Sequence, residues 1–171
     1  MMKKARPTSD LVLQALFNIL GPGEERSFLD LFSGTGRVGI GALSKGFAPV
    51  VMVDTSIKRL NRLAELSGLQ GLEILAMDVR KALSLLNNQI RLFDVIFADP
   101  PYETGWVARM ASLRSCLVAI TKDEGVFVLE HTKREAVDPA QWGGWFFQSR
   151  AYGDTLLTFF TKTVEGREPS Y

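Results

Sequence analysis

Short apolar runs alternate along the chain with longer stretches in which apolar residues recur at helical spacing. The apolar runs predict buried strands at Ser27–Phe32, Val50–Asp54, Glu73–Met77, Phe93–Ala98 and Gly125–Glu130. The amphipathic stretches predict helices at Arg37–Lys45, Ser56–Leu66, Val79–Leu86 and roughly Trp106–Thr121, after a first helix that Thr8 or Ser9 caps and that ends at Leu20. Such alternation is typical of a parallel sheet with helices on both faces.

The C-terminal part has a different pattern. In "WFFQSRAYGDTLLTFFTK" two β-rich runs flank Gly153-Asp154, and two residues of this kind favour a tight hairpin turn. We therefore expect an α/β, Rossmann-like fold with a mostly parallel seven-stranded sheet that ends in an antiparallel hairpin. A single domain is expected over residues 1–171, with an N-terminal helical segment at 1–24, a core at 25–163 and a frayed tail at 164–171.

Composition limits the class of function. Twenty Lys and Arg residues against 19 Asp and Glu residues give a formal charge of +1, which excludes the broad positive field of a protein that coats nucleic acid. The single cysteine, Cys116, cannot form an internal disulfide. No apolar run reaches the ~20 residues that a membrane span needs, and the N-terminus does not resemble a secretory signal. We therefore expect a cytoplasmic protein that does not associate with membranes.

The letters "FLDLFSGTGRVGIG", which begin at Phe28, read as a strand, a glycine turn and a helix start. The glycines match G-x-G-x-x-G, a pattern that brings backbone close to a ligand and aims a helix N-terminus at it. A dinucleotide would place its pyrophosphate here, but Asp30 would repel that group and suits an ammonium. A ligand that joins adenosine to an amino acid fits better, and S-adenosylmethionine (SAM) is such a ligand. The predicted contacts in this region are Asp30, Ser33, Gly34, Thr35 and Gly36.

Further acids close the next two predicted strands. Asp54, followed by Thr55, can accept both ribose hydroxyls, while the Asp78 side chain and the Val79 amide can meet the adenine ring. A helix N-cap is the simpler interpretation of any one such Asp. Ligands of open α/β sheets bind at the carboxyl ends of the strands, so these acids are predicted to face one crevice.

The fourth predicted strand ends in "DPPY", which is Asp99, Pro100, Pro101 and Tyr102. If the Asp99 carboxylate and the Pro100 carbonyl each accept one N–H of a ring-conjugated amine, the nitrogen lone pair is directed out of the ring plane toward a methyl group. The prolines restrict the backbone that carries this carbonyl. Tyr102 offers a flat face on which a base can stack, worth ~1–3 kcal/mol. Asp99 is also counted among the cofactor contacts, and its carboxylate can take the proton after transfer.

The chain resembles the RsmD-type bacterial methyltransferases, which methylate the exocyclic N2 of a guanine in 16S ribosomal RNA. The resemblance rests on "RPTSDLVLQALFNIL", "FLDLFSGTGRVGIGALSKG", "VMVD", "FDVIFADPPY", "FVLEH" and "YGDTLLTFF". It implies SAM as cofactor, bound by Asp30, Gly34, Gly36, Asp54 and Asp78, and a target-base site at Asp99, Pro100 and Tyr102. It also implies that the segment from Arg6 to Thr8 borders cofactor and RNA.

The substrate side departs from that family. Its members usually carry a β-rich N-terminal segment ahead of "RPT", which we expect this chain to lack. The predicted RNA contacts are Lys3, Lys4, Arg6, Thr8 and Tyr102, whereas the cations Lys58, Arg59 and Arg62 favour a solvated helix face. So few cations give modest, salt-sensitive binding, which favours a shaped site in an assembling small-subunit particle over naked RNA. We expect a monomer, no metal, and a structural role for His131.

Other functions fit part of the pattern. N6-adenine methylation of DNA or RNA could use the same "DPPY" tetrapeptide, since guanine N2 and adenine N6 are both ring-conjugated amines. A nicotinamide oxidoreductase would explain the glycines but leaves "DPPY" without a role. A non-catalytic RNA-binding or assembly protein would keep the fold and lose turnover.

Overall fold

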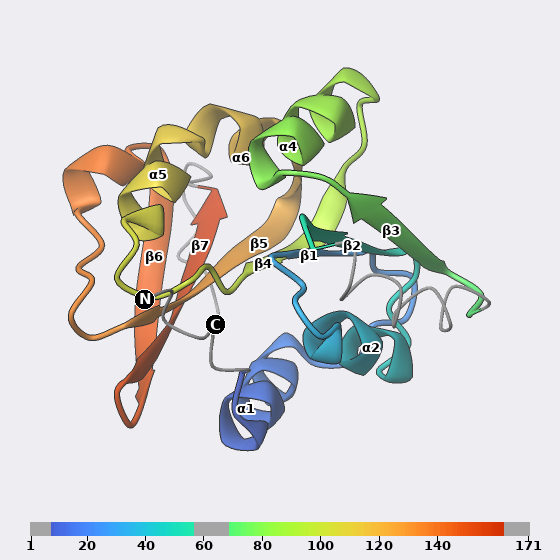
Figure 1. The fold of residues 1–171 in the computed structure, drawn as a ribbon, viewed down its shortest axis with the longest axis horizontal. Coiled ribbons are helices and arrows are strands. Elements are labelled where there is room, and N and C mark those ends of the chain that lie inside the picture. Colours follow the sequence, from blue (N-terminus) through green and yellow to red (C-terminus); the bar gives the residue numbers. More distant parts are fainter. Residues whose placement is uncertain (1–7, 57–68, 163–171) are drawn as a thin grey trace.

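The computed structural model describes residues 8–56 and 69–162. Seven strands form one sheet in the order β3-β2-β1-β4-β5-β7-β6 (Figure 1). The strands are β1 (Phe28–Leu31), β2 (Val50–Asp54), β3 (Leu72–Ala76), β4 (Phe93–Ala98), β5 (Thr121–Thr132), β6 (Trp145–Tyr152) and β7 (Thr155–Lys162). Neighbours among β1 to β5 pair in parallel, and β7 pairs antiparallel with both β5 and β6. The predicted α/β fold with its C-terminal hairpin is confirmed.

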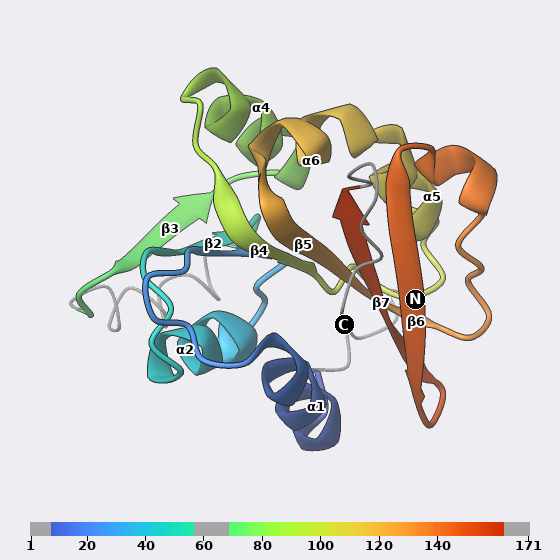
Figure 2. The same ribbon diagram turned by 180° about the vertical axis from the view of Figure 1, so that it is seen from behind.

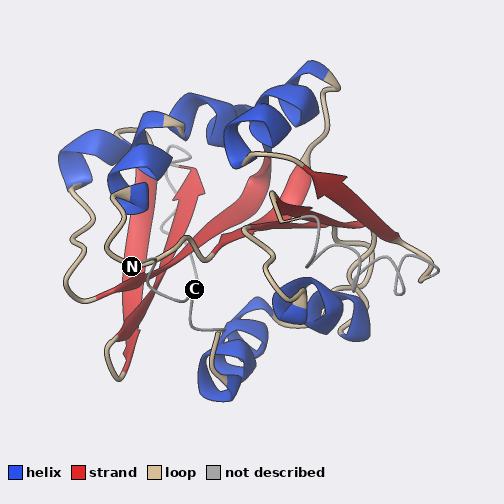
Figure 3. Cartoon of the chain, viewed as in Figure 1, coloured by secondary structure: helices blue, strands red, loops and turns tan. Residues whose placement is uncertain are grey.

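Helices cover both faces of the sheet (Figures 1 and 2). One face carries α1 (Asp10–Leu20) and α2 (Arg37–Ser44), and the other carries α4 (Val79–Asn88), α5 (Trp106–Ser112), α6 (Arg114–Ile120) and the 3₁₀ turn η1 (Pro139–Trp142) (Figure 3). The Ser9 side chain caps α1 by accepting from the Val12 amide, as predicted. Within the described residues, no helix has the length and apolar character needed to cross a membrane. The predicted helix Ser56–Leu66 and tail 164–171 lie outside the described residues.

Alternation along β1 divides the core into two layers. Leu29 and Leu31 pack with α4, α5 and α6, whereas Phe28 packs with α1 and α2 on the opposite face. Asp30 has the same parity as Phe28 and is 1% exposed. The strand therefore carries one acid into the layer next to α2.

The predicted helix Trp106–Thr121 is two helices that meet at Leu113. Ser112 Oγ donates to the Arg109 carbonyl at 2.7 Å, a local bond of the kind that bends helices. The Leu113 amide is shared between the Arg109 and Met110 carbonyls, each at 3.1 Å, so the regular ladder is interrupted there.

The strand predicted at Gly125–Glu130 is longer, because β5 already begins at Thr121. Thr121 pairs with Phe93 before the register shifts, and regular pairing resumes where Val126 meets Val95. A Cβ on Gly125 would lie 2.9 Å from the Phe93 carbonyl oxygen, so this irregularity requires a residue without a side chain. Periodicity alone does not reveal such a bulge.

Gly39 supports the contact between α2 and β2. A Cβ there would lie 2.3 Å from Met52 Sδ and 3.3 Å from Asp30 Oδ2. We expect Gly39→Ala to lower the free energy of unfolding by about 1–3 kcal/mol through overpacking, measured by urea denaturation. Gly143→Ala is the matched control, because its added Cβ would meet only Arg114 Nη1, at 3.6 Å. Equal stability of the two variants would contradict the packing argument.

Candidate functional site

Parallel register gathers the candidate residues at one edge of the sheet. Leu31 pairs with Val53 of β2 and with Ala98 of β4, and Ala98 pairs with Leu129 of β5. The residues that follow these positions begin the glycine turn, close β2, form the "DPPY" stretch and supply Glu130. The carboxyl ends of four adjacent strands therefore meet where the sequence predicted a crevice.

The glycine turn is fastened to the end of β2. Ser33 donates its amide to the Val53 carbonyl at 2.9 Å, and the Gly34 amide donates to Asp54 Oδ2 at 2.8 Å. Gly34 and Gly36 have φ of 55° and 79°, which side chains disfavour, and Gly36 is the N-cap of α2. Thr35 is exposed at the tip of the turn.

Asp30 lies beneath the turn and not at its surface. Its Oδ2 accepts the Gly39 amide at 3.0 Å in the first turn of α2. Burial raises the pKa of Asp30 to about 8; the Gly39 hydrogen bond opposes this rise and the nearby Asp54 carboxylate adds to it. Asp30 is therefore largely protonated at neutral pH, and a cation bound beside it would favour release of that proton.

Asp54 and Asp78 bind backbone amides at their strand ends. Asp54 accepts from the Gly34 amide through Oδ2 and from the Ser56 amide through Oδ1, the latter at 2.7 Å. Asp78 caps α4 by accepting from the Arg80 amide at 2.9 Å. The bond from the Arg80 side chain is the main cause that lowers the pKa of Asp78. The N-cap interpretation thus holds for Asp78, whose Oδ1 also accepts the Arg80 Nε–H at 2.9 Å. Thr55 is exposed, and Val79 begins α4.

The "DPPY" stretch is held from both sides. Asp99 Oδ2 accepts the Thr8 hydroxyl at 3.1 Å, and the Tyr102 hydroxyl donates to Glu130 Oε1 at 2.7 Å. Pro100 is buried and Pro101 is exposed, so the backbone turns outward between them. The structure therefore brings Thr8, predicted on the substrate side, next to the catalytic candidate Asp99.

Glu130 is a site residue that the sequence reasoning missed. It is 1% exposed and lies on β5 beside the end of β4. Burial raises the pKa of both Asp99 and Glu130, and the Glu130 charge raises that of Asp99 further. An acid within the apolar run "VFVLEH" was the available signal, since an acid is rarely fully buried without a reason.

His131, the next residue, has the predicted structural role. Its Nε2 pairs with the Thr158 hydroxyl at 2.8 Å, and its Nδ1 lies 2.9 Å from the Glu135 carbonyl oxygen. Burial lowers its pKa, which favours the neutral ring.

Arg37 links the glycine turn to the "DPPY" stretch through Thr8. Its guanidinium donates to the Thr8 carbonyl at 3.0 Å and pairs with the Asp10 carboxylate. The Thr8 hydroxyl in turn contacts Asp99. Arg37, at the start of α2, therefore fixes the residue that contacts the Asp99 carboxylate. The Asp10 carboxylate is the acid that this guanidinium pairs with.

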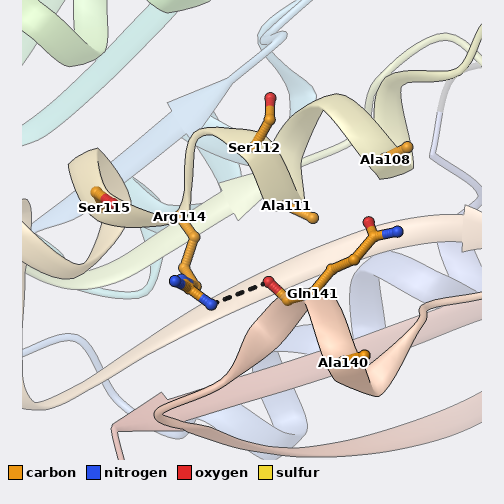
Figure 4. A pocket seen from close by; sticks show the side chains of 7 residues that line it. All are labelled: Ala108, Ala111, Ser112, Arg114, Ser115, Ala140 and Gln141. Carbon is orange, nitrogen blue, oxygen red and sulfur yellow. Dashed lines mark hydrogen bonds between the residues drawn. The ribbon is translucent and has the colours of Figure 1, made fainter.

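Several predicted contacts are not tested by the structure. Lys3, Lys4 and Arg6, together with the cations of residues 57–68, lie outside the described residues. Among the residues that the structure describes, no group of His, Cys, Asp and Glu could hold a metal ion. A separate cavity of about 380 Å³ between α5, α6 and η1 is lined by none of the predicted site residues (Figure 4).

Residues 1–161 match the profile of the family described as Conserved hypothetical protein 95. The chain belongs to this family. The YlbH protein of Bacillus subtilis (strain 168) is 31% identical over 163 residues, which are 92% of this chain and 88% of that protein. The "Ribosomal RNA small subunit methyltransferase D" of Escherichia coli (strain K12) is 29% identical over 94% of this chain and 81% of its own length.

Among solved structures, the Conserved hypothetical protein 95 fold is similar to a 16S rRNA N2 G1207 methyltransferase, RsmC, of Thermus thermophilus in complex with AdoMet and guanosine. The TM-score is 0.73 at 27% identity, over 94% of this chain and 44% of that one. Together with the family match, this confirms the resemblance to RsmD-type proteins that the motifs indicated.

Buried acids make stability depend on pH. Because the folded-state pKa of Asp30 lies near 8 and its ordinary value is 3.8, the folded chain binds more protons between these values. We expect the free energy of unfolding to fall as pH rises from about 4 to 8, by up to ~1.4 kcal/mol per pH unit from this one group. Asp30→Asn should flatten that slope in urea titrations. An unchanged slope would contradict the protonated state assigned to Asp30.

Proposed function

We propose that this protein transfers a methyl group from SAM to N2 of a guanine in 16S rRNA. The observation that carries the proposal is the "DPPY" stretch beside the glycine turn, with Asp99 held by Thr8 and Tyr102 held by Glu130. Relatives named as small-subunit rRNA methyltransferases support it, as does a structural neighbour that was solved with AdoMet and guanosine. We further propose that the protein acts as a cytoplasmic monomer on an assembling small-subunit particle.

The residues at the strand ends fit SAM. Asp30 is a buried acid with no cation among the ion pairs of the described residues, and it lies below the turn where an amino-acid ammonium would bind. The positive φ of Gly34 and Gly36 allows close approach of a ligand to the turn. In this proposal the Asp54 carboxylate accepts the ribose hydroxyls and the Asp78 carboxylate accepts the adenine amine.

When bound, SAM would supply a methyl group on a sulfonium sulfur that leaves as a neutral thioether when the sulfur–methyl bond breaks, so a neutral nitrogen can attack without prior deprotonation. The Asp99 carboxylate and the Pro100 carbonyl accept the two N–H groups of the amine and direct its lone pair out of the ring plane. The Tyr102 ring supports the base, and its hydroxyl bond to Glu130 at 2.7 Å fixes the ring. Asp99 then accepts the proton that the methylated nitrogen releases. Alignment of the reacting atoms is the main contribution to the rate.

The target must leave any duplex before it can enter. The Asp99 carboxylate is half-buried at the edge of the sheet. A base that is stacked inside a nucleic-acid duplex cannot reach it. Flipping such a base costs a few kcal/mol, least for an unpaired one. This favours a loop or bulge of the RNA as the acceptor.

Asp99→Ala tests the chemical role. We expect the rate of methyl transfer to fall by at least ~100-fold, because orientation of the amine is lost. The dissociation constant for SAM, measured by calorimetry, should change by about tenfold at most, since one polar contact is worth ~0.5–1.5 kcal/mol. Asp123→Ala, an exposed acid whose partner is Lys162, is the matched control. Loss of both transfer and SAM binding would mean that Asp99 holds the cofactor.

The acceptor is identified by tritium transfer. Labelled SAM is incubated with the protein and with small-subunit particles, protein-free rRNA, DNA and protein fractions, followed by nucleoside analysis. N2-methylguanosine in particles is the expected product. N6-methyladenosine would support the adenine alternative, and label in protein alone, or in no fraction, would refute the proposal.

SAM affinity should rise with pH. Below about pH 8 a cation at Asp30 must displace a proton, so affinity is expected to increase by up to ~10-fold per pH unit toward that value and then level off. Calorimetry in buffers of different ionisation enthalpy should detect proton release near pH 7. The Asp30→Asn variant should bind SAM without releasing a proton. Equal proton release from both proteins would exclude Asp30 as the source of the proton.

A further inference from the structure

Glu130 and Asp99 form a pair of acids at the ends of adjacent strands. Leu129 pairs with Ala98 across β5 and β4, so the two acids are the next residues along parallel strands. Thr8 contacts Asp99 and Tyr102 contacts Glu130, which encloses the pair between the N-terminal segment and the loop after β4. The two groups are close enough that ionisation of Glu130 raises the pKa of Asp99.

The two oxygens of Glu130 have different surroundings. Oε1 accepts the Tyr102 hydroxyl at 2.7 Å, while Oε2 is buried without a hydrogen-bond partner. A naked carboxylate oxygen in such a place is costly, whereas an oxygen that carries a proton leaves only a neutral hydroxyl unpaired. Oε2 is therefore the atom at which a proton lowers the energy most.

The groups around the pair are neutral or acidic. Tyr102 and Thr8 are uncharged donors, the Asp30 carboxyl on the β1 side raises the pKa of Asp99 further when it ionises, and the neutral ring of His131 is turned to Thr158 on β7. None of the ion pairs in the described part of the chain includes either acid. Without a cation, two neighbouring carboxyl groups do not both ionise readily.

Resting on the proposed function, we infer that Glu130 is a positioning residue that holds the one proton of the Asp99–Glu130 pair, so that Asp99 stays an ionised acceptor for the substrate amine. The proton resides on Glu130 because that side chain is 1% exposed, whereas Asp99 is half-buried and receives the Thr8 hydroxyl. Neutral Glu130 still accepts the Tyr102 hydroxyl through Oε1. It thereby fixes the stacking ring without adding a second negative charge.

The first test compares Glu130→Gln with Glu130→Leu in methyl transfer to small-subunit particles. Leucine removes the acceptor of the Tyr102 hydroxyl, and we expect the rate to fall by about tenfold or more, the effect of one lost hydrogen bond. Glutamine keeps an acceptor and is neutral at every pH, so it should recover most of that loss. A glutamine variant as impaired as the leucine variant would overturn the inference, because the ionised form would then be the working one.

The second test needs neither SAM nor RNA, so it is independent of the proposed function. A carboxyl with a raised folded-state pKa makes the unfolding equilibrium constant increase with pH, by up to ~10-fold per pH unit. We expect Glu130→Gln to reduce that increase between about pH 5 and 8 in urea titrations. Asp99→Asn should reduce it less, because the remaining Glu130 is still buried. The reverse order, or no change in Glu130→Gln, would overturn the assignment of the proton.

If the native chain shows no methyl transfer at all, the proposed function fails while the pH dependence of unfolding still decides the state of Glu130. If transfer occurs and the pH dependence of Glu130→Gln equals that of the native chain, only the inference fails.

Discussion

The site depends on acidic side chains that the sheet buries together, and no ion pair in the described part of the chain includes Asp30, Asp99 or Glu130. Parallel register places Asp30, Asp54, Asp99 and Glu130 at one edge, where helix amides, turn amides and hydroxyl groups are their partners. Each such donor stabilises a carboxylate, yet burial still holds the pKa of Asp30, Asp99 and Glu130 above the ordinary range. An edge of this kind is suited to a ligand that brings positive charge and N–H donors, as SAM and an exocyclic amine do.

The arrangement of the site also depends on the first residue of α2. Arg37 holds the Thr8 carbonyl while the Thr8 hydroxyl holds Asp99, so the glycine turn and the "DPPY" stretch share one intermediary. The dipole of α2 disfavours a cation at its first turn, but the Asp10 carboxylate compensates for it. The start of α2 thus also fixes the position of Thr8 beside Asp99.

Much of this arrangement could be predicted from the sequence, because strands buried on both faces appear as apolar runs and their carboxyl ends face one crevice. Other features depend on tertiary contacts. Ser112 bonds back to Arg109 and divides a helix that periodicity predicts as one, and Gly125 allows a bulge that only the Phe93 carbonyl explains. Glu130 was missed because its partner, Tyr102, is distant in sequence.

The hydrogen bond from Tyr102 to Glu130 means that the stacking ring is anchored in the sheet and not in its own loop. The exposed residues that follow it have other partners: Arg134 pairs with Glu103, and Gly105 begins α5 with a positive φ of 76°. Evolution, or a protein engineer, could use that loop to alter which RNA surface is engaged while the methyl-transfer chemistry stays intact.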